Sequence, residues 1–177
     1  MMMNDKLEIK LLSENATLPT RENDADAGFD IYASESVTIE PQEKTLIATD
    51  LAINIPKGYV GLLTSRSGVS SKTNLVIETG KIDSGFQGHM KINVKNDEQF
   101  YRTTNYEYCD ISGDVIDVVV SKGDVKPFEF NESYSINKGD KLAQLVIVPI
   151  WTPELKQVEE FSNGSTRGAN GFGSSGY

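Results

Sequence analysis

The chain is organised around the stretch Gly80-Lys81-Ile82-Asp83-Ser84-Gly85-Phe86-Gln87-Gly88. Its three glycines permit backbone conformations that a side chain would forbid, so the stretch predicts a tight hairpin. Strand-like segments flank it, at 74–77 before and at 90–94 after. Open backbone groups in such a hairpin can bind the edge of a flat ligand, and the Asp83 carboxylate can polarise a water. In the alternative interpretation, Asp83 only closes a β-turn through a local hydrogen bond.

The length and charge of the chain limit its architecture and partners. With 177 residues, of which 38% are hydrophobic, the chain fits one domain with a two-layer β fold and much polar surface. The net charge of −9 argues against binding along a nucleic-acid backbone, which needs a basic face. A small polyanion stays possible, because one metal ion and a few Arg or Lys residues can reverse the local charge.

Cysteine and histidine are each present once, as Cys109 and His89. A lone cysteine excludes an intrachain disulfide and a thiolate zinc cluster, and a lone histidine excludes a His-rich metal site within one chain. Any metal is therefore expected to be a hard, oxygen-bound ion such as Mg²⁺. The chain has neither an apolar run of about 18 residues nor an apolar N-terminal signal. We therefore expect a cytoplasmic protein that does not enter a membrane.

Short β-prone segments separated by turn residues recur along the chain, which is the pattern of an all-β sandwich or barrel. Gly28 is expected to permit close backbone approach within one of these strands. One helical turn is expected at 69–73. The stretch at 26–33 is expected to lead from a polar loop into a strand, and further strands are expected at 7–12, 36–40, 45–55, 59–64, 115–120 and 142–150.

Three features need a further explanation. Residues 96–137 alternate aromatic with acidic and polar side chains, and either form a satellite sheet or bind a partner. Gln144 interrupts the most apolar strand, so it must bond a neighbouring backbone or face a polar site. The tail at 162–177 has the composition of a flexible linker, yet it contains Arg167 and Phe172, which suit a phosphate and an aromatic ring.

Five segments, taken together and in order, resemble the motifs of the trimeric dUTPases (deoxyuridine triphosphatases). The third and fifth are the specific ones, and the resemblance covers most of the chain except about 96–137. The long insert and the acidic character are most similar to bacteriophage members, staphylococcal phages in particular. The five segments are Ala27-Gly-Phe-Asp-Ile, Arg66-Ser-Gly, Gly80-Lys-Ile-Asp-Ser-Gly-Phe-Gln-Gly, Ala143-Gln-Leu and Arg167-Gly-Ala-Asn-Gly-Phe-Gly-Ser-Ser-Gly.

The resemblance implies an all-β, distorted jelly-roll β-barrel with a β-rich insert at 96–137. It implies a body at 1–161 and a flexible C-terminal arm at 162–177 that closes over the active site. It also implies a homotrimer with active sites at subunit interfaces. The reaction would be hydrolysis of dUTP to dUMP and pyrophosphate, with Mg²⁺ on the triphosphate, which keeps uracil out of DNA and supplies dUMP.

The resemblance further implies roles for individual residues. Asp83 would be the general base for a water that attacks the α-phosphorus, Gln144 would hold the same water, and Asp30 would hold the hydrated Mg²⁺ through water. The hairpin backbone would pair with uracil, Phe86 would lie under the deoxyribose, and the arm would supply a γ-phosphate contact and a ring that stacks on uracil. The expected substrate-binding residues are Arg66, Ser67, Gly68, Gly80, Ile82, Phe86, Lys91, Arg167, Phe172, Gly173 and Ser174.

This chain departs from the family pattern at three positions. Phe86 replaces a usual Tyr, Lys81 replaces a usual apolar residue, and His89, where the family often has an acid, is interpreted as a surface residue.

Two other functions compete with the hydrolase. A dCTP deaminase shares the fold, but it needs a glutamate near the position of Gln87, and an amide cannot serve as that base. The second is a nucleotide-switched regulatory protein that binds a staphylococcal pathogenicity-island repressor through 96–137, a role that is compatible with catalysis. On this hypothesis, deleting 96–137 spares turnover and abolishes repressor binding.

Overall fold

The computed structural model of the chain describes residues 6–99, 105–120, 132–166 and 168–169. Over these residues the chain is built from strands and one short helix, as the sequence predicted. In chain order the elements are β1 (Glu8–Leu11), β2 (Gly28–Tyr32), β3 (Val37–Ile39), β4 (Lys44–Asn54), β5 (Tyr59–Ser65), α1 (Ser67–Lys72), β6 (Leu75–Ile77), β7 (Gly80–Ile82), β8 (Met90–Asn96), β9 (Asn105–Cys109), β10 (Val115–Val120), β11 (Glu132–Ile136) and β12 (Lys141–Pro149).

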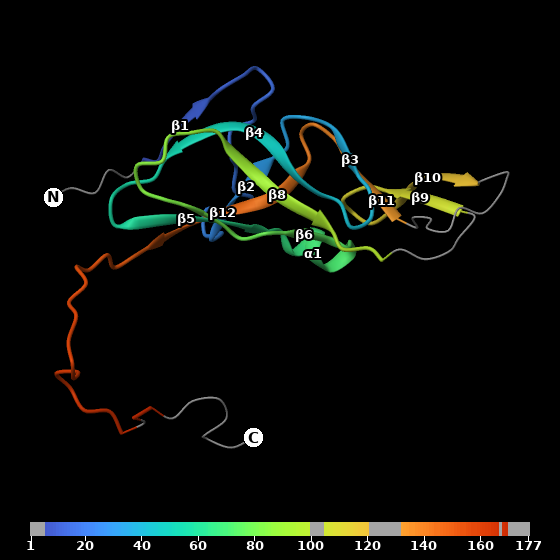
Figure 1. The fold of residues 1–177 in the computed structure, drawn as a ribbon. Coiled ribbons are helices and arrows are strands. Elements are labelled where there is room, and N and C mark those ends of the chain that lie inside the picture. Colours follow the sequence, from blue (N-terminus) through green and yellow to red (C-terminus); the bar gives the residue numbers. More distant parts are fainter. Residues whose placement is uncertain (1–5, 100–104, 121–131, 167, 170–177) are drawn as a thin grey trace.

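The strands form three four-stranded sheets (Figure 1), with orders β1-β4-β8-β6, β2-β12-β5-β7 and β10-β9-β11-β3. Strand side chains alternate between the core and the surface. In β8, Met90, Ile92 and Val94 are buried, while Lys91 between them is exposed. One apolar core joins residues of all three sheets, such as Ile92, Leu145 and Ile136. Folding therefore buries one face of each sheet in a common interior.

The stretch at 80–88 lies inside a hairpin that is wider than predicted. Its flanking strands β6 and β8 pair antiparallel, with Ile77 opposite Val94, which confirms the predicted strands on either side. The prediction of a tight turn was wrong. Residues 78–89 form the connection, and β7 within it leaves the hairpin to pair with β5 in another sheet. β7 is the last strand of that sheet, so its outer edge is left without a strand partner among the described residues.

The predicted insert at 96–137 is joined to the body at both ends. β9 and β10 form an antiparallel pair that projects from the body in Figure 1. β11 pairs with β9 on one side and with the body strand β3 on the other. Cys109, Tyr134 and Ile136 belong to the common core. The β9–β10 pair therefore extends beyond the body, whereas Cys109 and β11 help to build the common core.

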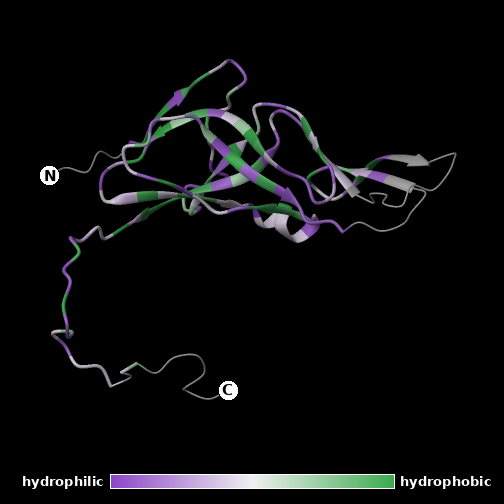
Figure 2. Ribbon diagram, in the orientation of Figure 1, coloured by the Kyte–Doolittle hydropathy of each residue, from purple (hydrophilic) through white to green (hydrophobic). Residues whose placement is uncertain are grey.

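The chain leaves the body after β12. Residues 151–166 are all exposed and run away from the sheets in Figure 1, and Figure 2 shows apolar residues along this run. Trp151, Leu155 and Phe161 are 87%, 98% and 90% exposed. Large apolar side chains are seldom left in water as a group, so this segment is suited to covering another protein surface.

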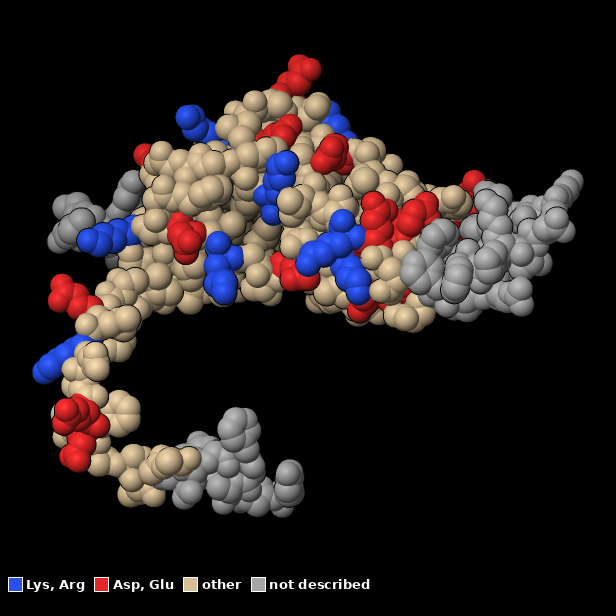
Figure 3. Space-filling view, in the orientation of Figure 1, with Lys and Arg blue, Asp and Glu red and all other residues tan. Residues whose placement is uncertain are grey.

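The surface of the body carries both signs of charge, as Figure 3 shows for one face. Over the described ranges, no helix is long and apolar enough to cross a bilayer.

Candidate active site

A buried carboxylate, Asp30 on β2, is the centre of a polar cluster. Arg66 Nε donates to Asp30 Oδ1 at 2.8 Å, and Gln144 Nε2 donates to the same oxygen at 3.4 Å. Lys141 Nζ lies 3.1 Å from the other oxygen, Oδ2. A buried charge is costly unless it is paired and hydrogen-bonded, and here both oxygens have cationic partners.

Strand register brings this cluster together. On β12, Gln144 lies opposite Asp30 of β2 on one side and Thr64 of β5 on the other. Arg66 follows β5 directly and caps α1, so its side chain reaches back to Asp30. A Cβ at Gly28 would lie 3.1 Å from the Cβ of Gln144, so this glycine leaves room for the Gln144 side chain rather than for the backbone approach that was predicted. Of the two alternatives for Gln144, the structure shows a polar site, because its amide donates to the Asp30 carboxylate.

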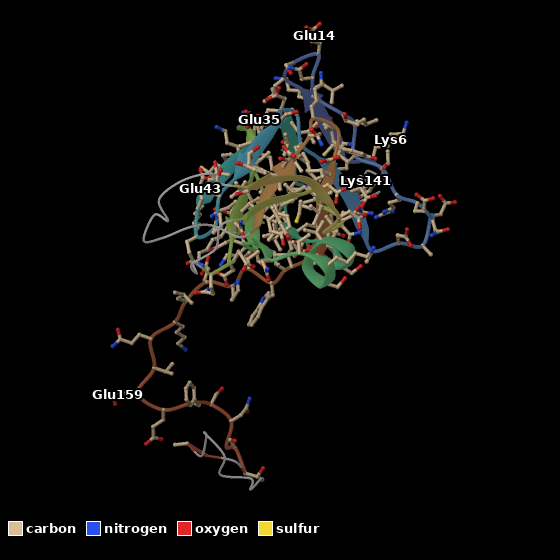
Figure 4. The ribbon with its side chains drawn as sticks, turned by 90° about the vertical axis from the view of Figure 1, so that its right-hand side faces the viewer. Lys6, Glu14, Glu35, Glu43, Lys141 and Glu159 are labelled. Atoms are coloured by element: carbon tan, nitrogen blue, oxygen red, sulfur yellow. The ribbon has the colours of Figure 1, made fainter. Side chains whose placement is uncertain are left out.

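Lys141 is the member of the cluster that the sequence analysis missed. Lys141 and Gln144 are three positions apart, and in a regular strand they would face opposite sides of the sheet. A register shift between Lys141 and Ala143 in the pairing of β12 with β2 changes this, and both side chains reach Asp30. Figure 4 labels Lys141 on the body, far from Glu159 of the exposed segment. No pattern in the sequence indicated this bulge.

The cluster shifts the pKa of its members. Burial raises the pKa of Asp30, but hydrogen bonds from Lys141 and Gln144 and the charges of Arg66 and Lys141 outweigh it, so the pKa is lowered. The pKa of Lys141 is raised, chiefly by its hydrogen bond to Asp30 and then by the nearby Tyr32 and the Asp30 charge. Asp30 is thus held as a carboxylate at neutral pH.

The loop after β7 has the opposite character. Asp83 is exposed, and its carbonyl oxygen accepts a hydrogen bond from the Phe86 N–H at 3.1 Å, which closes a turn. Phe86 is 45% exposed, and its ring lies over the backbone of Gly88. The side-chain Nε2 of Gln87 donates to Asn54 Oδ1 of β4 at 3.3 Å. A carboxylate and an aromatic ring are therefore both open to a ligand.

The Asp30 cluster and Asp83 lie apart within one chain. β7 is separated from β12 by β5, and it runs from Gly80, level with Leu145, to Ile82, level with Ile147. Asp83 therefore continues away from Gln144, and standard strand dimensions put the two roughly 15 Å apart. The predicted water shared by Asp83 and Gln144 cannot be held by both residues of the same chain.

The remaining predicted site residues are distributed over several places. Ser67 and Gly68 are exposed at the start of α1, beside Arg66. Gly80 and Ile82 lie on β7, next to Asp83. Lys91 is exposed on β8, which belongs to a different sheet from the Asp30 cluster. Arg167, Phe172, Gly173 and Ser174 lie outside the described residues.

A magnesium ion fits this donor set only as a hydrated ion. Among the described residues, no group of three or more acidic, His or Cys side chains could hold a metal. Asp30 offers a single carboxylate, whose oxygens already accept from Arg66, Lys141 and Gln144. Mg²⁺ keeps several waters and is commonly held by substrate phosphates, so Asp30 could bind it through water.

The chain matches known proteins along nearly its whole length. The dUTPase family model matches residues 14–111 and 104–176. A deoxyuridine 5'-triphosphate nucleotidohydrolase of Debaryomyces hansenii is 33% identical over 171 residues, 96% of this chain and 87% of that protein. Its counterpart in Mycolicibacterium gilvum is 31% identical over 180 residues, 98% of this chain and 97% of that protein.

Solved structures of staphylococcal phage proteins are more similar still. A Staphylococcus bacteriophage 80alpha dUTPase mutant with dUpNHpp has 53% identity and a TM-score of 0.85, and the match covers 98% of this chain and all of that chain. The dUTPase from phage phi11 of S. aureus has 56% identity and a TM-score of 0.77, over 90% of this chain and all of that one. The predicted jelly-roll fold and the predicted likeness to phage members are confirmed. The chain belongs to the dUTPase family.

Proposed function

We propose that the chain is a dUTP diphosphatase that hydrolyses dUTP to dUMP and pyrophosphate, in a site completed by a second copy of the chain. One observation carries the shared site. The Asp30 cluster with Arg66 and Gln144 lies on the strands β2, β12 and β5. The chain runs along β7 away from the level of Gln144, so Asp83, which follows β7, lies apart from the cluster. Asp83 and Gln144 must contact the same water, but they lie too far apart within one chain. A homotrimer with active sites shared between subunits explains this geometry.

The described residues fit this chemistry. Asp83 is exposed and takes a proton from a water, whose oxygen bonds to the α-phosphorus while the bond to the β-phosphate oxygen breaks. Arg66 and Ser67 contact phosphate oxygens and stabilise the charge that moves onto the leaving pyrophosphate. Mg²⁺, when bound with the triphosphate, neutralises part of its charge. The open edge of β7 and the Phe86 ring are the surfaces for uracil and deoxyribose.

Related structures support the ligand and the metal. The 80alpha protein was solved with dUpNHpp, and a structure of a phi11 variant is described as revealing how a structural Mg(II) ion is coordinated. We extend both to this chain as part of the proposal. We also propose that the exposed segment with Trp151, Leu155 and Phe161 packs on a neighbouring copy. It would lead the arm at 162–177, with Arg167 and Phe172, toward that copy's site in the host cytoplasm.

Subunit mixing tests the shared site. Asp83→Asn and Arg66→Ala variants should each be nearly inactive alone. Unfolding and refolding them together in equal amounts should restore about a quarter of wild-type pyrophosphate release, because half of the chains supply each intact part. Each variant refolded alone is the control. No recovery in mixtures that assemble normally would overturn the shared site, and release compared across dUTP, dCTP, dTTP and UTP tests the substrate.

Deamination of dCTP is the first alternative, and the placement of Gln87 argues against it. The Gln87 side chain is an amide that donates to Asn54 on β4. It therefore offers no base beside Asp83. Release of ammonia from dCTP would establish deamination and contradict the hydrolase.

A regulatory role is a second function that the same protein can have. A study of the 80alpha protein states that phage dUTPases control transfer of virulence genes by a G protein-like mechanism, and another concerns its SaPI inducing capacity. We propose that the insert of this chain binds a pathogenicity-island repressor, with Val115 and Ile116 exposed on β10 as apolar contacts. Deleting 96–137 is a poor test, because it removes Tyr134 and Ile136 from the core. Ile116→Asp should instead abolish repressor binding and leave dUTP turnover unchanged.

A further inference from the structure

The helix α1 joins the phosphate-binding end of the candidate site to the insert. Arg66 and Ser67 lie at its start, and Lys72 is its last residue, roughly 9 Å further along the axis. Between the two ends, Val69 is the helix residue buried in the core. Because the helix is anchored in the packed core through Val69, a displacement at one end is transmitted to the other end.

The turn between β9 and β10 of the insert packs directly against the last residue of α1. Gly113 in this turn has a φ of +79°, and a Cβ built on it would lie 2.2 Å from the carbonyl oxygen of Lys72. No real contact is that short, and the obstacle is backbone rather than a movable side chain. Asp110 shapes the turn, because its Oδ1 accepts from the N–H groups of Ser112 and Asp114 at 2.8 and 3.1 Å.

The residues just after α1 are held by other parts of the same insert. The N–H of Asn74 donates to the hydroxyl of Tyr134 on β11 at 3.1 Å. The Asn74 side chain donates to Glu98, where the insert begins, and the N–H of Asp97 donates to the Asn74 carbonyl at 2.9 Å. In Figure 1, α1 lies at the base of the projecting β9–β10 pair. The C-terminal end of α1 thus contacts the start, the turn and the last strand of the insert.

We propose that the turn at 110–114 is a positioning element for the hydrolysis reaction. Through its contact with α1, the turn fixes the positions of Arg66 and Ser67. This inference rests on the proposed function, since it assigns those two residues to the triphosphate. Packed interiors transmit small displacements, and a shift of an ångström in a binding group can cost a large factor in rate. The uracil-facing residues on β7 and in the loop at 83–88 do not contact this turn in any described interaction. Binding of phosphates should therefore depend on the turn, and binding of the nucleoside should not.

A pair of glycine substitutions tests the proposal. Gly113→Ala introduces the clash with Lys72, whereas Gly58→Ala adds a side chain at a similar φ of +88° with nothing within 4 Å. We expect Gly113→Ala to raise the KM for dUTP and the Kd for dUpNHpp about tenfold or more relative to Gly58→Ala. The Kd for dUMP, which lacks the β- and γ-phosphates, should stay within about twofold, because the nucleoside contacts are intact.

A milder pair keeps the proposal falsifiable if Gly113→Ala does not fold. Asp110→Ala loosens the turn without a clash, and Asp110→Asn retains the accepting Oδ1. Asp110→Ala should weaken dUpNHpp binding without changing dUMP binding, and Asp110→Asn should restore it. Equal effects on dUMP and dUpNHpp, or a Gly113→Ala variant that binds as Gly58→Ala does, would overturn the positioning role. A wild-type protein that releases no pyrophosphate from dUTP would instead overturn the proposed function.

Discussion

The Asp30 cluster and the Asp83 loop are two carboxylate sites of opposite design. Asp30 is buried and is bound by Arg66, Lys141 and Gln144 of its own chain. Asp83 is exposed, follows an edge strand, and has an open surface beside it. The Asp30 cluster is a closed site, because its interactions are complete within one folded chain. The Asp83 loop is an open site, because its carboxylate is accessible to a ligand.

The difference follows from the task that each carboxylate would have. A group that holds cationic side chains in place works best when its own position is fixed by packing. A general base needs room for a water and a substrate within hydrogen-bond reach. The two carboxylates lie at different levels of the same sheet, with β5 and β12 register placing Gln144 well away from the end of β7, and this separation is the basis of the proposed shared site.

Substitution in the open site, at Asp83, should have the larger effect on the rate of hydrolysis. Asp83→Asn removes the proposed base and keeps the shape of the side chain, so hydrolysis should fall about 10³-fold while dUpNHpp binding is retained. Pyrophosphate release and calorimetric binding measure the two effects. A variant that keeps most of the wild-type kcat would show that Asp83 is not the base.

The open site should also depend on the C-terminal arm that we propose covers it. Removing residues 164–177 takes away Arg167 and Phe172, and kcat should fall about 100-fold because a closing segment excludes water and orients the phosphates. Gel filtration should show an assembly of unchanged stoichiometry. Unchanged turnover would mean that the arm has no part in catalysis.

Substitution in the closed site, at Asp30, should have the larger effect on the stability of the folded chain. Asp30→Asn removes the carboxylate that Arg66 and Lys141 share, and Lys141 keeps the exposed Glu22, whose Oε2 lies 3.8 Å from Lys141 Nζ. The free energy of unfolding should fall by about 1–2 kcal/mol, since both cations remain partly in contact with water. Urea denaturation measures the change. Equal stability of variant and wild type would show that the cluster serves function alone.

Acid should weaken the closed site in a defined pH range. The lowered pKa of Asp30 means that the unfolded chain binds a proton more readily than the folded chain. The stabilisation is therefore complete above the unfolded value, near pH 4, and is lost as pH falls through the folded value. The stability of the wild type should decline below about pH 4 more steeply than that of Asp30→Asn, in thermal melts from pH 2 to 7. Parallel curves would contradict this assignment.

An exposed ion pair serves as a control, for which only a small change in stability is expected. Lys44 Nζ lies 2.6 Å from Glu78 Oε1, with both side chains about half exposed. Glu78→Gln should change the free energy of unfolding by less than about 0.5 kcal/mol, because water screens such pairs. A loss as large as that of Asp30→Asn would remove the contrast between buried and exposed charges.

The sequence alone determined the family, the all-β class and the identity of most candidate site residues. Motifs such as Arg66-Ser-Gly and the stretch around Asp83 are local, and strand alternation is a local pattern too. Gln144 was also foreseen as a polar residue in need of partners, because burial in an apolar strand demands them.

Tertiary structure alone decided which of these residues meet. The bulge before Ala143 turns Lys141 toward Asp30, and no local pattern announces a register shift. β7 leaves its hairpin for another sheet, which sends Asp83 away from Gln144. The contact of Gly113 with Lys72 joins residues far apart in sequence. The chemistry of a side chain follows from the type of a single residue, whereas strand register and packing depend on interactions across the whole fold.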